Sequence, residues 1–168
     1  MTDSSFSVRQ VGDEAAVRVV GRATAAFGPA LRQFLLAAPS RGVRSLAVDL
    51  GQCVYLDSTF IGILAMMAVE SRETAVCLRL ANAGPVPRRH LASLGVEGLF
   101  SYVDAPLADG PWEALGGSGC VTSSGGLHAL GRTVLEAHEA LGAMNPDNVP
   151  RFRDAVESLR REVQRGRP

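Results

Sequence analysis

The hydrophobic pattern of the chain is most distinctive between residues 45 and 73. Residues 45–50 form an apolar run of strand length that is broken only by Asp49, which predicts an internal strand of a sheet. Residues 59–73 are apolar on nearly every side of a helical projection, so they predict a largely buried helix. Between the two lies the polar sequence Asp57-Ser58-Thr59. Such side chains accept hydrogen bonds from the free N–H groups of a first helical turn, so they predict a helix N-cap.

Strand-like and helix-like patterns alternate on both sides of this stretch. A hairpin is expected first, because two short runs with β-branched residues flank a Gly-Asp-Glu turn. After it, strands and helices alternate, which predicts an α/β fold with a mixed sheet of about four to five strands packed with helices. The expected strands are 6–11, 15–20, 45–50, 76–81 and 99–103, and the expected helices are 25–38, 59–73, 86–94 and a helical turn at 109–115.

The C-terminal third has a different pattern. Residues 116–126 are rich in glycine and serine, which predicts a flexible linker. Residues 127–168 carry apolar residues at alternating steps of three and four, interrupted near residue 146, which predicts a helical hairpin. The chain therefore divides into a globular domain (1–115), a linker (116–126) and a hairpin extension (127–168). A hairpin of this length is marginal alone, so it must dock on the globular domain, on a second copy or on a partner.

Composition excludes several classes of function. The chain has 17 basic residues, all arginine, and 17 acidic residues, so its net charge is zero and we expect no nucleic-acid partner. Without lysine there is no phosphate-loop lysine and no Schiff base. The three cysteines form no Cys-x-x-Cys pair, which indicates reduced thiols in a cytoplasmic protein. The N-terminus has no signal-peptide character, and the longest apolar run is about half of a membrane span, so we expect a soluble chain.

Catalytic and metal sites are not indicated either. His128 and His138 are ten residues apart, which is not the spacing of a metal pair on adjacent turns. The sequence offers no nucleophile with a base, no cluster of metal ligands and no cofactor loop. We therefore expect that the protein is not an enzyme and that it carries no metal and no cofactor.

Ser58 has two interpretations. Capping of the helix alone explains the polar sequence that contains it. The functional interpretation is that a hydroxyl at a helix N-terminus can accommodate a phosphate, because the free N–H groups and the helix dipole favour an anion there. A phosphoserine adds roughly −1.5 to −2 charges at neutral pH, which is enough to create or abolish an interface.

The same residues resemble a known family. The sequence Val48-Asp49-Leu50, followed by residues 54–59 and an apolar helix, is similar to the centre of a STAS domain, the fold of bacterial anti-sigma factor antagonists. The resemblance extends over roughly residues 6–115. In that family the serine directly after the aspartate is phosphorylated by a partner kinase, and that serine corresponds to Ser58. The sequence departs from the family pattern at Phe60, where the family usually has glycine.

The resemblance implies a regulatory protein that acts in signal transduction and transcription regulation. Its expected partners are a serine-kinase anti-sigma factor and a cognate phosphatase. The expected phosphorylation site is Ser58, with Thr59 as the alternative, and Arg22 is either a partner contact or a solvated turn residue. The alternative function is a non-switching STAS scaffold in a stressosome-like or lipid-transport complex, and the hairpin is a possible site of homo-oligomerisation. The expected partner-binding residues are Asp57, Ser58, Thr59, Phe60 and Arg22.

Overall fold

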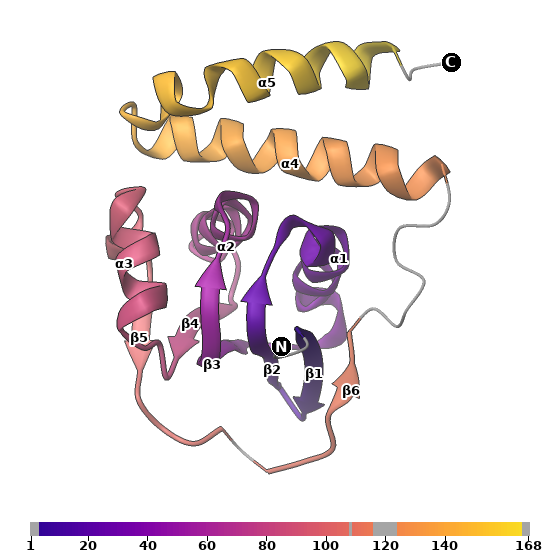
Figure 1. Cartoon of the computed structure of the whole chain (residues 1–168). Helices are drawn as coiled ribbons and strands as arrows, with labels where there is room; N and C mark the ends of the chain where they lie inside the picture. The colour runs from indigo at the N-terminus through magenta and orange to yellow at the C-terminus, as the bar shows by residue number, and fades with distance from the viewer. Residues whose placement is uncertain (1–3, 108, 116–123, 166–168) are drawn as a thin grey trace.

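A six-stranded mixed sheet forms the base of the molecule in the computed structural model, which describes residues 4–107, 109–115 and 124–165 (Figure 1). The strand order is β5-β4-β3-β2-β1-β6. Neighbours from β2 to β5 are parallel, whereas β1 is antiparallel to both β2 and β6. The strands are β1 (Ser5–Val11), β2 (Glu14–Ala23), β3 (Ser45–Leu56), β4 (Cys77–Ala81), β5 (Ser101–Val103) and β6 (Glu113–Ala114).

The helices lie in layers on one face of this sheet. A large apolar cluster joins the core side of the strands to the first three α-helices. The helices are α1 (Gly28–Ala37), α2 (Ser58–Glu70), α3 (Pro85–Ser93), α4 (Ser124–Met144) and α5 (Asn148–Arg165), with short 3₁₀ turns at Ala25–Phe27, Pro39–Arg41 and Glu97–Leu99. The α/β fold with a C-terminal helical hairpin is therefore confirmed.

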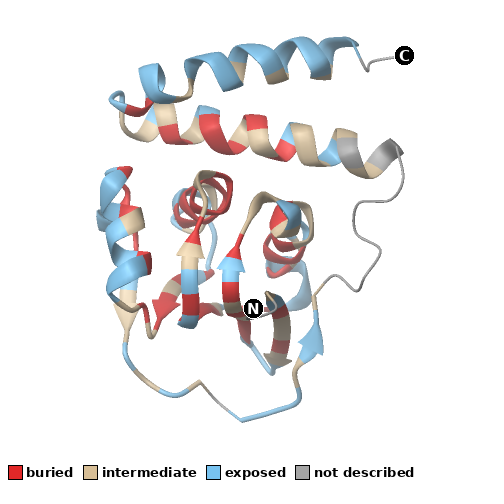
Figure 2. Ribbon diagram, in the orientation of Figure 1, coloured by how far each residue is buried: buried red, intermediate tan, exposed pale blue. Residues whose placement is uncertain are grey.

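The hairpin α4–α5 is a separate outer layer. Helix α4 lies across α1 and α2, and α5 lies on the outside of α4 (Figure 1). The inner side of α4 is buried, while most of α5 is exposed (Figure 2). The sequence left open whether the hairpin docks on the globular domain, on a second copy or on a partner. In the part of the chain that the structure describes, it docks on the globular domain.

Two segments differ in the kind of structure from the prediction. Residues 109–115 were expected to form a helical turn, which is wrong, because Glu113 and Ala114 pair with β1 as an edge strand. Helix α4 begins at Ser124, inside the stretch expected to be a linker, and residues 116–123 of that stretch lie outside the described residues.

The second face of the sheet carries a smaller cluster. The buried side chains of this cluster are small, and the Trp112 side chain packs against them. The guanidinium groups of two arginines lie over the Trp112 ring. The guanidinium carbons of Arg9 and Arg18 lie 4.5 Å and 4.1 Å from the centre of the Trp112 ring. Arg18 also donates a 3.1 Å hydrogen bond to Asp49, whose other oxygen accepts from the backbone N–H of Gly51. Asp49 thus has the structural role of a carboxylate that joins β3 to Arg18 of β2.

Candidate functional site

The carboxylate of Asp57 connects two segments at the end of the sheet. Asp57 is the N-cap of α2, with extended backbone angles, and its Oδ1 accepts a 2.8 Å hydrogen bond from the N–H of Phe60. Its Oδ2 accepts a 2.6 Å hydrogen bond from the N–H of Ala25, which follows β2. The predicted cap is therefore present. One charged side chain holds the start of α2 against the 3₁₀ turn that leads into α1.

Ser58 is the first residue of α2 and is half-buried. Its Oγ lies 2.8 Å from Nε2 of His138, a residue of α4 that is 80 positions away in the sequence. The His138 ring is 8% exposed and stacks on the Phe152 ring of α5, with centroids 4.5 Å apart and planes 8° from parallel. The candidate modification site therefore lies beneath the hairpin.

The environment of His138 favours a neutral imidazole. Burial lowers the pKa of His138 below its usual range, and the nearby Asp57 carboxylate opposes this effect. The ring's Nδ1 is buried and has no hydrogen-bond partner among the described residues. In a nucleophilic triad that nitrogen would be held by a carboxylate, but the two oxygens of Asp57 are occupied by backbone N–H groups. The Ser58–His138 pair therefore has the geometry of a packing contact rather than of an activated nucleophile.

The other expected site residues are placed differently. Thr59 is 3% exposed and Phe60 is fully buried, where its ring lies 5.5 Å from that of Phe6. The Phe60 ring is thus part of the core in the docked state, and its expected contact with a partner stays a prediction. Its role is to fill the core beneath the first turn of α2.

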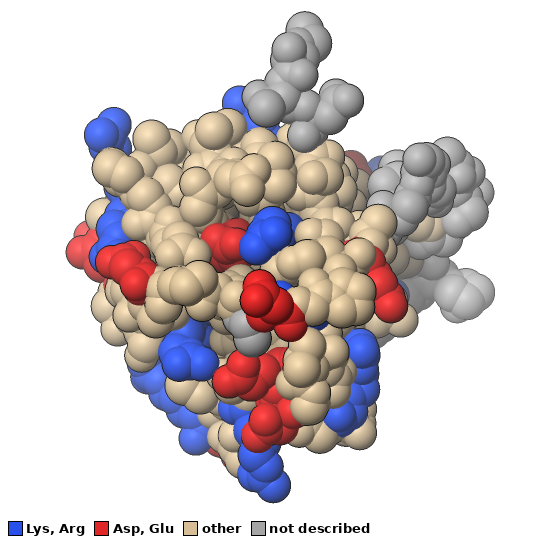
Figure 3. All heavy atoms as spheres, turned by 90° about the horizontal axis from the view of Figure 1, so that it is seen from below, with Lys and Arg blue, Asp and Glu red and all other residues tan. Residues whose placement is uncertain are grey.

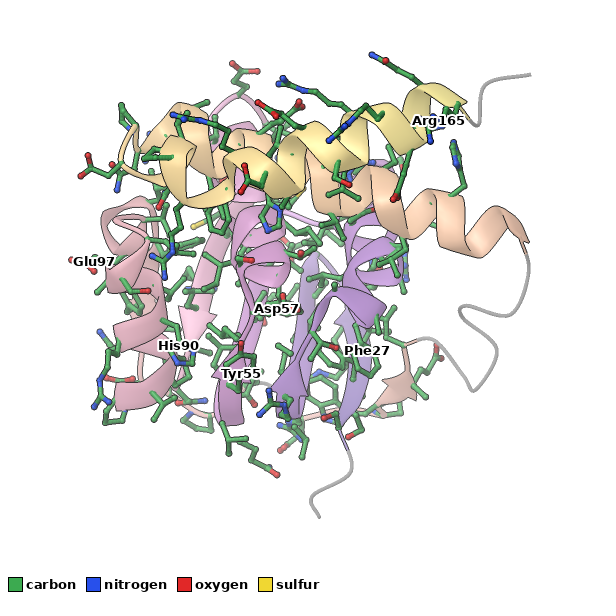
Figure 4. The ribbon with its side chains drawn as sticks, turned by 45° about the horizontal axis from the view of Figure 1, so that its top comes forward. Phe27, Tyr55, Asp57, His90, Glu97 and Arg165 are labelled. Atoms are coloured by element: carbon green, nitrogen blue, oxygen red, sulfur yellow. The ribbon has the colours of Figure 1, made fainter. Side chains whose placement is uncertain are left out.

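Arg22 is exposed and lies at the end of β2, next to β3. Its guanidinium carbon lies 4.1 Å from the centre of the Tyr55 ring, which meets His90 of α3 edge to face at 5.1 Å. His90 in turn accepts a 3.2 Å hydrogen bond from the N–H of Leu56. Figure 4 shows Tyr55 and His90 beside each other, with Asp57 closer to the hairpin. Arg22 thus belongs to a row of side chains with Tyr55 and His90.

The face opposite the hairpin mixes acidic and basic side chains (Figure 3). It therefore offers no field of a single sign to a charged partner. Within residues 4–107, 109–115 and 124–165, no three His, Cys, Asp or Glu side chains gather as a metal site would require. None of the helices in these segments is long and apolar enough to cross a bilayer.

The comparison with protein families decides the classification of this fold. A family model described as "Mlab, STAS domain" matches residues 6–102. The chain belongs to the STAS domain family. The matched residues of this STAS protein run from β1 into β5 and include α1 to α3, and the hairpin α4–α5 lies outside them.

Solved structures similar to this STAS protein have the same fold. The unphosphorylated form of the anti-sigma factor antagonist SpoIIAA has a TM-score of 0.53 at 16% identity, over 60% of this chain and 89% of the other. An anti-sigma factor antagonist from Mycobacterium paratuberculosis has a TM-score of 0.52 at 22% identity, over 61% and 87%. The phosphorylated form of the Bacillus protein SpoIIAA has a TM-score of 0.50 at 16% identity, over 60% and 92%. No curated protein matched the sequence.

The sequence did not single out His138 as a partner of Ser58. The residue adjoins the apolar stripe of its helix, next to Ala137 and four residues after Val134. A histidine beside such a stripe is a sign that it points inward. Its contact with Ser58 depends on how the hairpin docks, which no local pattern specifies.

Proposed function

We propose that this STAS protein is a regulatory binding module similar to anti-sigma factor antagonists. In this proposal the surface around Ser58 binds a serine-kinase anti-sigma factor. Phosphorylation of Ser58 by that kinase weakens the complex, and a phosphatase restores it. The observation that supports the proposal is the position of Ser58, the first residue of α2 directly after its Asp57 cap, in a chain of the STAS family.

The energetics of such a switch are reasonable. A hundredfold loss of affinity corresponds to about 2.7 kcal/mol. A group with roughly two negative charges that is forced into an interface supplies this much by desolvation and repulsion. Here the phosphate would also adjoin the carboxylate of Asp57, which is held in place by two backbone N–H groups. Phosphorylation of Ser58 would therefore add negative charge at one fixed point of the surface.

The test compares the wild-type protein, Ser58→Asp and Ser158→Asp as baits in the native cell extract. Ser158 is exposed on α5 and serves as a control for the added charge. We expect the wild type and Ser158→Asp to recover an ATPase related to histidine kinases, and Ser58→Asp to lose it. The recovered kinase, incubated with ATP, should place phosphate on Ser58 and none on Ser58→Ala. Equal recovery by all three baits, with no phosphate on Ser58, would contradict the proposal and favour a non-switching scaffold.

A further inference from the structure

The hairpin α4–α5 occupies the surface next to Ser58. Helix α4 crosses α1 and α2, and a glycine of each of these two helices faces it. A Cβ atom built on Gly62 of α2 would lie 2.6 Å from the carbonyl oxygen of Ala137, and one on Gly28 of α1 would lie 3.3 Å from Thr133. Helices α2 and α4 therefore approach each other at backbone distance, and the docked α4 leaves no room for another molecule at this point.

The contact directly covers the modification site. Ser58 Oγ and His138 Nε2 are at hydrogen-bond distance, and the imidazole is pressed against Phe152. A phosphate on Ser58 Oγ would need the space that this ring fills. A kinase also needs the serine hydroxyl in its own active site, which the docked hairpin prevents.

The hairpin lies outside the part of the chain that matches the family. The residues that match the STAS family model end at residue 102, before α4 begins at Ser124. In the docked state, Nδ1 of His138 is buried with no partner among the described residues, so the imidazole is held by one hydrogen bond only. Besides the Ser58–His138 pair, the polar contacts to the domain within the described segments join Arg32 to Glu136, Asn145 and Asn148 to Leu94, and Arg151 to Ser93.

We propose that α4–α5 is a removable autoinhibitory cover, which must leave the surface of α1 and α2 before a partner or a kinase can reach Ser58. The inference rests on the proposed function for the identity of the partner. The cover itself is a physical property of the chain and can be tested without any partner. The close approach of α4 at Gly62 also specifies what replaces it: a partner helix with a small residue opposite Gly62.

The test measures the accessibility of position 58 in the full chain. Ser58→Cys is combined with Cys77→Ser and Cys120→Ser, which leaves Cys53 as the second thiol, in a buried position. The probe is N-ethylmaleimide, with the labelled residue identified by mass spectrometry. Ala137→Leu is added to push α4 away from Gly62, because Ala137 is fully buried against α2. Ala129→Leu is the matched control, since Ala129 is exposed on the same helix.

We expect Ala137→Leu to accelerate labelling of the thiol at position 58 at least tenfold and Ala129→Leu to change it less than twofold. Hydrogen exchange followed by mass spectrometry checks the state of each variant, and Leu141→Asp is a second variant that opens the interface. Loss of protection in α4 with β2 and β3 still protected shows a detached hairpin on a folded domain. If α4 detaches and the labelling rate stays the same, the proposal is wrong. The proposal is also wrong if Ala137→Leu and Leu141→Asp each lose the protection of α4 together with that of the sheet. The hairpin is then an integral part of the fold.

The outcome separates this proposal from the proposed function. One possible result is that opening exposes the thiol at position 58, while no kinase recovered from the extract phosphorylates the Ala137→Leu protein with Ser58 intact. This result would support the cover and contradict the phosphorylation switch. If Ser58 is phosphorylated at the same rate in the wild type and in Ala137→Leu, the switch stands and the cover fails.

Discussion

Asp57 shows how far local sequence determines this site. A carboxylate before an apolar helix is a cap signal that acts over three residues, so the sequence predicted it. Its second hydrogen bond, with the N–H of Ala25, spans 32 positions, so it could be identified only in the folded structure. The burial of Phe60 was likewise not visible in the sequence, because it depends on Phe6 in a distant strand. The role of a residue can be predicted from the sequence when its neighbours in the chain determine it. It cannot be predicted in this way when tertiary packing determines it.

The double role of Asp57 leads to a stability prediction. Asp57→Ala removes the cap of α2 and the bond to Ala25, so we expect it to lower the free energy of unfolding by about 2 kcal/mol. Urea unfolding measures the change. Asp154→Ala, at an exposed position of α5, is the control and should stay within about 0.5 kcal/mol of the wild type. Equal midpoints for the two variants would show that the carboxylate does not hold the two segments together.

Among the elements, the helices were easier to predict than the edges of the sheet. The apolar stripes of α4 and α5 and the all-round apolar α2 are strong periodic signals. The segment at 109–115 has an aspartate and a proline that favour a helix start, yet its backbone pairs with β1. An edge strand of two residues has too little pattern to be recognised, and the open edge of β1 decides its structure. Strand β3 likewise extends to Leu56, beyond the predicted end at residue 50, because β2 continues to pair with it.

The packing of α2 on α4 leads to a prediction with a matched pair of glycines. Alanine is more favourable than glycine in a helix by about 1 kcal/mol. At Gly131 of α4 the added methyl meets no atom within 4 Å, so Gly131→Ala should preserve or increase the protection of α4 amides. At Gly62 the methyl would collide with the Ala137 backbone, so Gly62→Ala should accelerate exchange in α4 at least tenfold. Equal protection in both variants would mean that the helices adjust without separating.

At the scale of the whole molecule, the docking of the hairpin was the question that the sequence left open. An amphipathic stripe shows that a helix is covered but does not show by what. The answer came from the small residues of α1 and α2, whose significance is visible only when the helices are placed together. The fold class was predictable from the order of the elements, whereas the relation between hairpin and site was not.

The buried imidazole makes this docking sensitive to pH. The pKa of His138 is lowered in the docked state, so the free state binds the proton more readily. Docking should therefore be strongest above the ordinary histidine pKa of about 6.5 and weaken as the pH falls below it. The charged groups that share this environment are Asp57 of α2, Glu139 of α4 and, from α5, Arg153, Glu157 and Arg160.

Hydrogen exchange at pH 7.5 and 5.5, corrected for intrinsic rates, tests this expectation. The protection of α4 amides should fall at the lower pH in the wild type and in His128→Gln. It should become independent of pH in His138→Gln, which cannot be protonated. A fall of equal size in His138→Gln would assign the effect to another group.

The stacking of Trp112 between Arg9 and Arg18 has an optical consequence. This is the only tryptophan of the chain, and it lies on the face of the sheet that the helices do not cover. Its fluorescence therefore reports on the integrity of the sheet and is insensitive to the departure of α4. The natural fluorophore and a dye on the hairpin would follow two separate events in one sample, so the undocking and the unfolding of this protein can be timed independently.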